Sequence, residues 1–140
     1  MYDAVLVPTD GSEAAIHAAN HAYSLGERYD ATVHVLTVVE KSESTTIVGQ
    51  GDEKLETLRD EGNDSTQRIV EEALSRDIHA VGTVEMGDPA RTILTYAEDH
   101  DIDLIVMSTH GRSGVGRFLM GSVTERVLRD GDVPVLAVQR

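Results

Sequence analysis

Five short runs of mostly apolar residues recur along the chain, and this recurrence constrains the fold more than any other feature of the sequence. Continuous apolar runs of about four to eight residues are typical of strands that are buried on both faces of a sheet. The five runs are Ala4–Pro8, Thr32–Val39, Val81–Met86, Leu104–Met107 and Val133–Val138.

Stretches whose apolar residues recur every three or four positions separate these runs, and they predict helices. The first is rich in alanine, which favours a helix lying close to a sheet. Asp88 and Pro89 suit the N-cap and the first position of the third helix, because proline needs no N–H donor there. The helices are predicted over residues 12–29, 53–76, 89–97 and 123–130; the second is expected to bury Leu55, Leu58, Ile69, Ala73 and Leu74, and to bend or fray at Gly62-Asn63.

Strands that alternate with helices imply an α/β fold, with a doubly wound parallel sheet and helices on both of its faces. The length of 140 residues fits a single domain, 1–140, and the sequence shows no internal repeat, linker or low-complexity tail. In such sheets ligands bind beyond the carboxyl ends of the strands, where the strand order reverses. The loops after the first and fourth strands are therefore the candidate site.

The charge of the chain argues against several partners. Twenty-five Asp and Glu residues against twelve Lys and Arg residues give a net charge of −13, and only Lys41 and Lys54 are lysines. Such a surface repels nucleic acid and anionic membranes. A strongly acidic, lysine-poor surface also resembles that of proteins from salt-loving organisms, where high ionic strength screens the self-repulsion.

Several missing features narrow the class further. No apolar run approaches the roughly 18 residues of a membrane span, and the first residues do not read as a signal peptide, so a cytoplasmic protein is expected. The chain has no cysteine, which excludes disulfides and thiolate metal sites. His17 and His21 lie one helical turn apart, but no third ligand accompanies them, so no metal site made by the protein alone is predicted.

The stretch from Met107 to Leu128, MSTHGRSGVGRFLMGSVTERVL, has the chemistry of an anion site. Glycines let the backbone approach a ligand without an intervening Cβ, and the helix that starts near Ser122 attracts anions through its N–H groups and its dipole. No Asp or Glu occurs from Leu104 to Thr124. The residues expected to serve a phosphate are Gly111, Gly114, Gly116, Gly121 and Ser122, with Arg112 and Arg117 steering it and His110 either donating to it or shaping the turn.

Structural interpretations of some of these residues stay open. Ser122-x-x-Glu125 fits a capping box, which needs no ligand. Asp10 either contacts a ligand or caps the first helix, with Glu13 completing a similar box. Neither the P-loop pattern G-x-x-x-x-G-K-S/T nor the dinucleotide pattern G-x-G-x-x-G occurs, and the loop after the first strand lacks the S-G-G-x-D-S pattern of adenylating enzymes.

Taken together, these residues resemble the universal stress protein family. Its nucleotide-binding members carry the motif G-x-x-G-x9-G-S/T after the fourth strand, and the matching positions here are Ser108, Gly111, Gly121 and Ser122. The segment VPTDGSE after the first strand, the terminal PVLAVQ and the chain length extend the resemblance over essentially the whole sequence. Ser108 stands where the family motif has its first glycine.

The resemblance implies a fold, a ligand and an assembly. The fold would be an adenine nucleotide alpha hydrolase-like sheet of order 3-2-1-4-5, with ATP across the crevice and Mg²⁺ bound with it. Homodimers are usual in the family, and the apolar edge strand Val133–Val138 is the expected contact. The resemblance places adenine near the backbone of Val38 and Val39, the adenosine and ribose beside Pro8, Thr9 and Asp10, and the phosphates at Gly111, Gly114, Gly121, Ser122 and Val123, with Ser108 adding a contact.

Three functions are consistent with these residues and with the resemblance. The leading hypothesis is an ATP-binding stress-response signalling module, whose ligand state and dimer surface are read by an unidentified protein partner. Efficient catalysis is not expected, because no base is evidently aimed at the γ-phosphate. The alternatives are a dimeric interaction protein that binds no nucleotide, which Ser108 would favour, and a slow ATPase or a protein that phosphorylates itself on Ser122 or Thr124.

Overall fold

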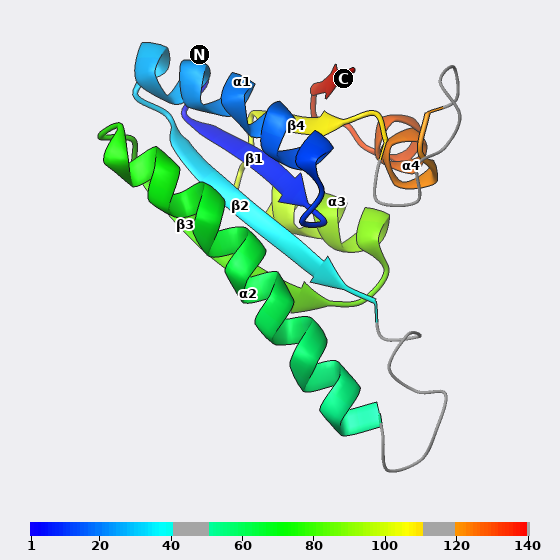
Figure 1. Ribbon diagram of the computed structural model, residues 1–140. Coiled ribbons are helices and arrows are strands. Elements are labelled where there is room, and N and C mark those ends of the chain that lie inside the picture. Colours follow the sequence, from blue (N-terminus) through cyan, green and yellow to red (C-terminus); the bar gives the residue numbers. More distant parts are fainter. Residues whose placement is uncertain (41–50, 111–119, 140) are drawn as a thin grey trace.

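All five predicted strands join one sheet, and the four predicted helices connect them (Figure 1). The structure, a computed structural model, describes residues 1–40, 51–110 and 120–139. The predicted bounds of the second strand are confirmed, and the other elements begin and end close to the predicted residues. In chain order the elements are β1 (Ala4–Thr9), α1 (Glu13–Tyr29), β2 (Thr32–Val39), α2 (Gly51–Ser75), β3 (Ala80–Met86), α3 (Pro89–Asp99), β4 (Leu104–Ser108), α4 (Ser122–Asp130) and β5 (Val135–Val138).

The strand order is β3-β2-β1-β4-β5 with every neighbouring pair parallel, which confirms the predicted doubly wound sheet. The central strand β1 pairs with β2 at six residue pairs, from Ala4 to Thr9. It pairs with β4 only at Val5 with Leu104 and at Leu6 with Ile105. The pairing of β1 with β4 is therefore lost toward the carboxyl ends of the two strands.

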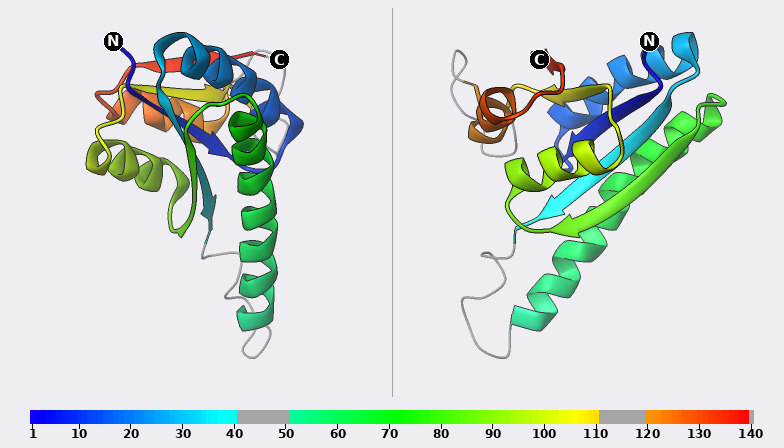
Figure 2. Two further views of the ribbon diagram at one scale, coloured as in Figure 1. Left: turned by 90° about the vertical axis from the view of Figure 1, so that its left-hand side faces the viewer. Right: turned by 180° about the vertical axis from the view of Figure 1, so that it is seen from behind.

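Two apolar cores lie on opposite faces of the sheet (Figure 2). Helices α1 and α2 cover one face, where Val33 and Val35 of β2 are fully buried. Helices α3 and α4 cover the other face, where Leu36 of the same strand is fully buried. Because its side chains are buried on both faces of the sheet, the strand is a nearly continuous apolar run in the sequence.

Gly62 does not bend α2, in contrast to the sequence-based expectation. It is buried where the helix lies against the sheet, and a Cβ added there would lie 3.2 Å from Thr37 Cγ2 and 3.4 Å from Val84 Cγ1. The helix runs without a break from Gly51 to Ser75. Glycine at this position thus allows close packing on β2 and β3, at the cost of its lower helix propensity.

The prediction that Leu74 belongs to the buried face of α2 is wrong. Its side chain is 51% exposed, whereas Ile69, Val70 and Ala73 are buried against the sheet. Successive residues of a helix are about 100° apart around its axis. Leu74 lies four residues, and thus about 40° around the axis, beyond Val70, at the edge of the buried stripe, where half of its side chain stays exposed.

Two local predictions at the ends of elements have different outcomes. Asp88 is the N-cap of α3, since its Oδ2 accepts a hydrogen bond from the backbone N–H of Arg91 at 3.0 Å, and Pro89 occupies the first turn as predicted. The last strand is shorter than predicted and begins at Val135. Pro134 has no N–H to donate to a ladder, although its carbonyl accepts from Ile105.

Candidate functional site

A cavity of about 380 Å³ lies at the carboxyl ends of β1, β2 and β4. It falls where β1 has β2 on one side and β4 on the other, which is the point where the strand order reverses. The lost pairing between β1 and β4 opens the sheet at this point. Cavities of this size at such a switch point are typical ligand sites.

The structure brings the predicted site residues together around this cavity. Each predicted residue that lies within the described ranges lines it, and these residues come from three strands and from the start of α4. They are Pro8, Thr9, Asp10, Val38, Val39, Ser108, Gly121, Ser122 and Val123, and His110 lines the cavity from the segment after β4. The remaining predicted residues, Gly111, Arg112, Gly114, Gly116 and Arg117, lie outside the described residues.

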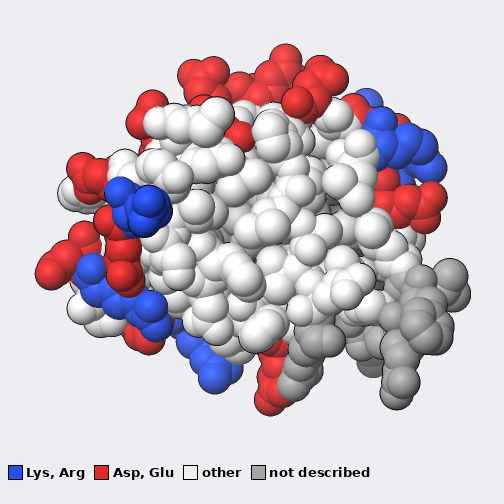
Figure 3. All heavy atoms as spheres, turned by 90° about the horizontal axis from the view of Figure 1, so that it is seen from above, with Lys and Arg blue, Asp and Glu red and all other residues white. Residues whose placement is uncertain are grey.

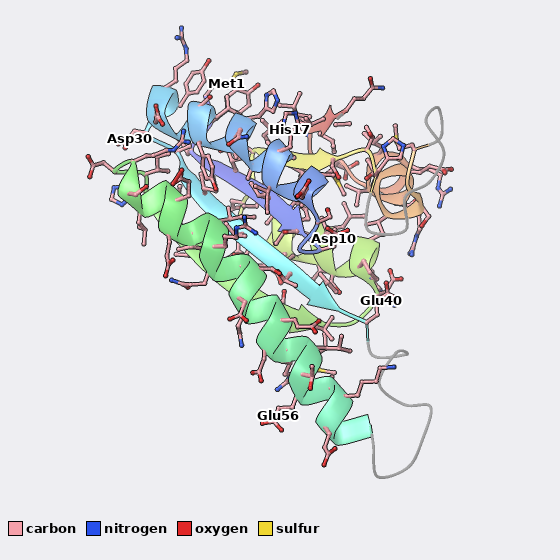
Figure 4. All side chains as sticks on the ribbon, viewed as in Figure 1. Met1, Asp10, His17, Asp30, Glu40 and Glu56 are labelled. Atoms are coloured by element: carbon pink, nitrogen blue, oxygen red, sulfur yellow. The ribbon has the colours of Figure 1, made fainter. Side chains whose placement is uncertain are left out.

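The turn after β1 is held by its own side chains. Thr9 Oγ1 accepts a hydrogen bond from the N–H of Gly11 at 3.1 Å, and Asp10 Oδ1 accepts one from the N–H of Ser12 at 2.9 Å. Ser12 caps α1, because its Oγ accepts from the N–H of Ala15 at 3.2 Å. The interpretation of Asp10 as the helix cap is therefore wrong; its carboxylate fixes the turn at the edge of the cavity (Figure 4).

Ser108 adopts an ordinary backbone conformation at the end of β4. Among the described residues other than glycine, a positive φ occurs only at Asp30, Asp77 and Asp101. Serine at the first position of the family motif is therefore free of backbone strain. Its hydroxyl donates to the carbonyl of His110, and its own carbonyl accepts from Thr124 Oγ1 at 2.8 Å, so Ser108 links the end of β4 to α4.

The start of α4 faces the cavity without a side-chain cap. Gly121 is the N-cap, and Ser122 is the first helical residue. The interpretation of Ser122-x-x-Glu125 as a capping box is therefore wrong, because no side chain caps the helix. Backbone N–H groups in the first turn of a helix have no partner within that helix, and they attract anions.

An ion pair fixes α4 against α3. Arg126 Nη1 lies 2.9 Å from Asp88 Oδ1, and the same carboxylate caps α3. The hydrogen bonds from Arg126 and from the Arg91 N–H hold the pKa of Asp88 below its usual value. Together with the bond from Thr124 to Ser108, this contact sets the position of the α4 N-terminus relative to the sheet.

Helix α2 supplies a wall of the cavity that the sequence reasoning missed. Leu58, Glu61, Gly62 and Ser65 line it. Their spacing of three and four residues places them on one helical stripe. The sequence predicted Leu58 as part of the buried face of this helix and Gly62 as a bend, and it gave no prediction for Glu61 or Ser65. Pro89, Ile93 and Met107 add apolar lining from α3 and β4.

The two sides of the cavity differ in charge. Its carboxylates in the described residues are those of Asp10 in the β1 turn and Glu40 at the end of β2 (Figure 4), and that of Glu61 on α2. The β4 and α4 side presents Ser108, Ser122 and other uncharged groups, together with His110. Within the described ranges no Lys or Arg lines the cavity. An anionic group is thus disfavoured beside β2 and α2 and is better accommodated at α4.

The described part of the chain contains neither a metal-binding cluster nor a membrane-spanning helix. No group of three or more His, Asp or Glu side chains within the described residues could hold a metal ion. The helices that the structure describes include none long and apolar enough to cross a membrane.

The fold and the site define the class of protein: a doubly wound α/β domain with a small-molecule cavity at its switch point. The chain belongs to the universal stress protein family, since the family model matches residues 1–139. Universal stress protein MJ0531 of Methanocaldococcus jannaschii is 34% identical to it over 142 residues, an alignment that covers 100% of this chain and 84% of that protein.

Solved structures share the same architecture. MJ0577 from the same archaeon matches with a TM-score of 0.91 and 31% identity, over 100% of this chain and 97% of that one. Two more distant relatives share the fold and were solved with adenine nucleotides. One is a universal stress protein in complex with cAMP (TM-score 0.69, 22% identity, 99% and 97% coverage), and the other is an Arabidopsis thaliana family protein with AMP bound (0.73, 16%, 99% and 92%).

Proposed function

We propose that this protein binds ATP in the switch-point cavity and acts as a stress-response signalling module. One observation carries the proposal: the described motif residues Ser108, Gly121 and Ser122 line the same cavity as the turn after β1 and the end of β2. Adenine would lie near Val38 and Val39, with the ribose beside Asp10. The phosphates would lie at Gly121–Val123, with Gly111, Arg112 and Gly114 joining from outside the described residues.

The charge distribution supports this orientation of the ligand. The uncapped α4 N-terminus and the hydroxyl-bearing β4 side suit phosphates, whereas Glu40 and Glu61 come from the end of β2 and from α2, on the other side of β1. Mg²⁺ would be held through the phosphates, since no cluster of described side chains could hold a metal by itself. The two adenine-nucleotide complexes of this fold agree with the class of ligand.

The alternative of an interaction protein that binds no nucleotide depended on Ser108. The ordinary backbone at Ser108 weakens that support, because serine needs no positive φ there; how closely a ligand approaches Ser108 is for the binding experiments below. Turnover of ATP would be slow or absent: Glu40 and Glu61 come from the β2 and α2 side of the cavity, and the carboxylate of Asp10 holds the β1 turn. Signalling through the bound state therefore remains the better proposal, with the ATP of the cytoplasm as the ligand pool.

We propose a homodimer formed through β5. This strand pairs with β4 on one side only, and Leu136 is 38% exposed. The face over α1 and β5 presents a broad area without charged side chains, bordered by Asp and Glu together with several basic side chains (Figure 3). For a chain of net charge −13, such an area is where a second copy meets the least repulsion.

Adding ATP and Mg²⁺ should raise the melting temperature if they bind only the folded protein. At a free ligand concentration 100 times the Kd, binding adds about 2.7 kcal/mol to the free energy of unfolding. We expect Ser122→Glu to abolish the shift by repelling phosphate, while an acid in the first turn preserves α4 itself. Differential scanning fluorimetry measures both effects.

The matched control is Ser122→Ala, which retains the backbone donors and should retain most of the shift. Absence of a shift for the native sequence at millimolar ATP would contradict the proposed function. A full shift with Ser122→Glu would instead move the phosphates away from α4. Native mass spectrometry of freshly purified protein reports bound nucleotide and the proposed dimer in the same spectrum.

A further inference from the structure

The α2 wall of the cavity is rigid. Thr66 Oγ1 donates to the carbonyl of Gly62 and shares a hydrogen bond with Thr37 Oγ1, both at 2.7 Å. Gly62 lies so close to β2 that a Cβ at this position would be 3.2 Å from Thr37 Cγ2. Helix α2 is thereby anchored to β2 at Gly62 and one turn later at Thr66, so a side chain beside Gly62 has a well-defined position relative to the end of β2.

Glu61 and Ser65 are the polar side chains of this wall. Both line the cavity, at positions four residues apart, so they lie one above the other on the helix surface. They border the part of the cavity formed by the end of β2, together with the apolar side chains of Leu58 and Val39. Apolar surface with a few polar groups is the usual environment for a planar base.

A carboxylate on this wall can only accept hydrogen bonds. Glu61 and Glu40, both exposed, disfavour an anion between β2 and α2 and favour a ligand group that donates hydrogen bonds. Among the parts of an adenine nucleotide, the base carries an exocyclic amino group, which is such a donor. The phosphates belong on the other side of β1 for the same electrostatic reason.

We propose that Glu61, with Ser65 beside it in the cavity wall, determines specificity for the base. The Glu61 carboxylate would accept a hydrogen bond from the exocyclic amino group of adenine. The inference rests on the proposed ATP site and deepens it. Hypoxanthine carries an oxygen where adenine carries this amino group, so inosine triphosphate would direct an acceptor at the Glu61 carboxylate. Glu61 is exposed in the structure without ligand, so the discrimination comes from the repulsion between two acceptors, its carboxylate and the oxygen of hypoxanthine.

The test compares Kd values for ATP and inosine triphosphate by calorimetry at fixed Mg²⁺. The native sequence should bind ATP about tenfold more tightly or better, the effect expected of a hydrogen bond to a charged group. In Glu61→Gln the side-chain amide can accept from adenine or donate to hypoxanthine, so the ratio should fall toward one. Glu56→Gln is the control, since Glu56 is an exposed carboxylate of the same helix outside the cavity (Figure 4).

The outcomes separate this inference from the proposed function. An unchanged preference for ATP in Glu61→Gln, with binding intact, would overturn the role of Glu61 and leave the ATP site standing. A native protein that binds both nucleotides equally would do the same. Failure of the native protein to bind either nucleotide would overturn the ATP site and this inference with it. Melting temperatures without ligand verify that each variant is folded.

Discussion

At the scale of single residues, the protonation of His34 links the stability of the fold to pH. It lies on β2 with its Nδ1 2.8 Å from the hydroxyl of Tyr96, and its ring centre is 5.7 Å from that of His100. Burial lowers the pKa of His34 below 6.5, and the nearby His100 lowers it further. Tyr96 also contacts Thr83 and feels the charge of Glu85, and burial raises the pKa of the Tyr96 hydroxyl.

This arrangement predicts a loss of stability in mild acid. Because the pKa of His34 is lower in the folded state, the unfolded chain binds the proton first as the pH falls below about 6.5. The contribution of neutral His34 to the free energy of unfolding is complete above that pH. It decreases as the pH falls toward the pKa of His34 in the folded state. His34→Gln should therefore flatten the pH dependence of urea unfolding between pH 7.5 and 5.5, about the range in which a histidine titrates.

His17→Gln is the matched control for this experiment, since His17 is exposed on α1. It should leave the slope of stability against pH nearly unchanged. Equal slopes for His34→Gln and the native sequence would show that His34 titrates alike in both states.

At the scale of elements, α2 approaches the sheet through glycines on both partners. Gly62 faces Thr37 from the helix, and Gly82 of β3 faces α2 from the sheet. A Cβ added at Gly82 would lie 2.5 Å from Thr66 Cγ2 and 3.1 Å from Val70 Cγ2. The same helix carries Glu61 and Ser65, so the packing of α2 on β3 also sets one wall of the cavity.

Gly82→Ala should destabilise the protein by about 1–3 kcal/mol, the usual cost of overpacking. Alanine would otherwise improve a strand, so a net loss identifies the clash with Thr66 as the cause. Chemical denaturation measures the free energy of unfolding. In the double variant with Thr66→Ser, which removes the clashing methyl group, most of the loss should be recovered; failure to recover it would locate the strain elsewhere.

At the scale of the whole molecule, a net charge of −13 makes self-repulsion the main long-range force. The ion pairs within the described ranges are exposed, such as that of Arg76 with Glu27 and that of Arg129 with Glu125. Exposed pairs contribute little to stability. Screening by salt therefore matters more for this chain than the pairs themselves.

We expect the melting temperature to rise with potassium chloride. The Debye length falls from about 10 Å at 0.1 M to about 3 Å at 1 M, so repulsion between carboxylates on neighbouring elements is largely removed. A neutral solute at the same osmolality should have a smaller effect. Indifference to salt over this range would exclude the adaptation to high salt that the composition suggests.

The strands and their carboxyl-end loops could be predicted because each strand is buried on both faces and each loop residue has distinctive chemistry. Val33 and Leu36 read as apolar although they face different helices. The cap of α1 could not be chosen from sequence, since Asp10 and Ser12 both suit it and the geometry of the turn decides between them. The place of Glu61 in the cavity wall could not be predicted, because it depends on how α2 lies against β2, which is a property of the tertiary packing.

The short pairing of β1 with β4 has one more consequence. Beyond Leu6 and Ile105, β1 and β4 no longer pair through backbone hydrogen bonds, and the cavity lies between their carboxyl ends. A nucleotide bound there would contact the β2 and α2 half of the molecule with its base and the β4 and α4 half with its phosphates. Binding of the nucleotide would then restrict the motion of the two halves of the sheet relative to each other. A partner protein could respond to this restriction without any change in the mean structure.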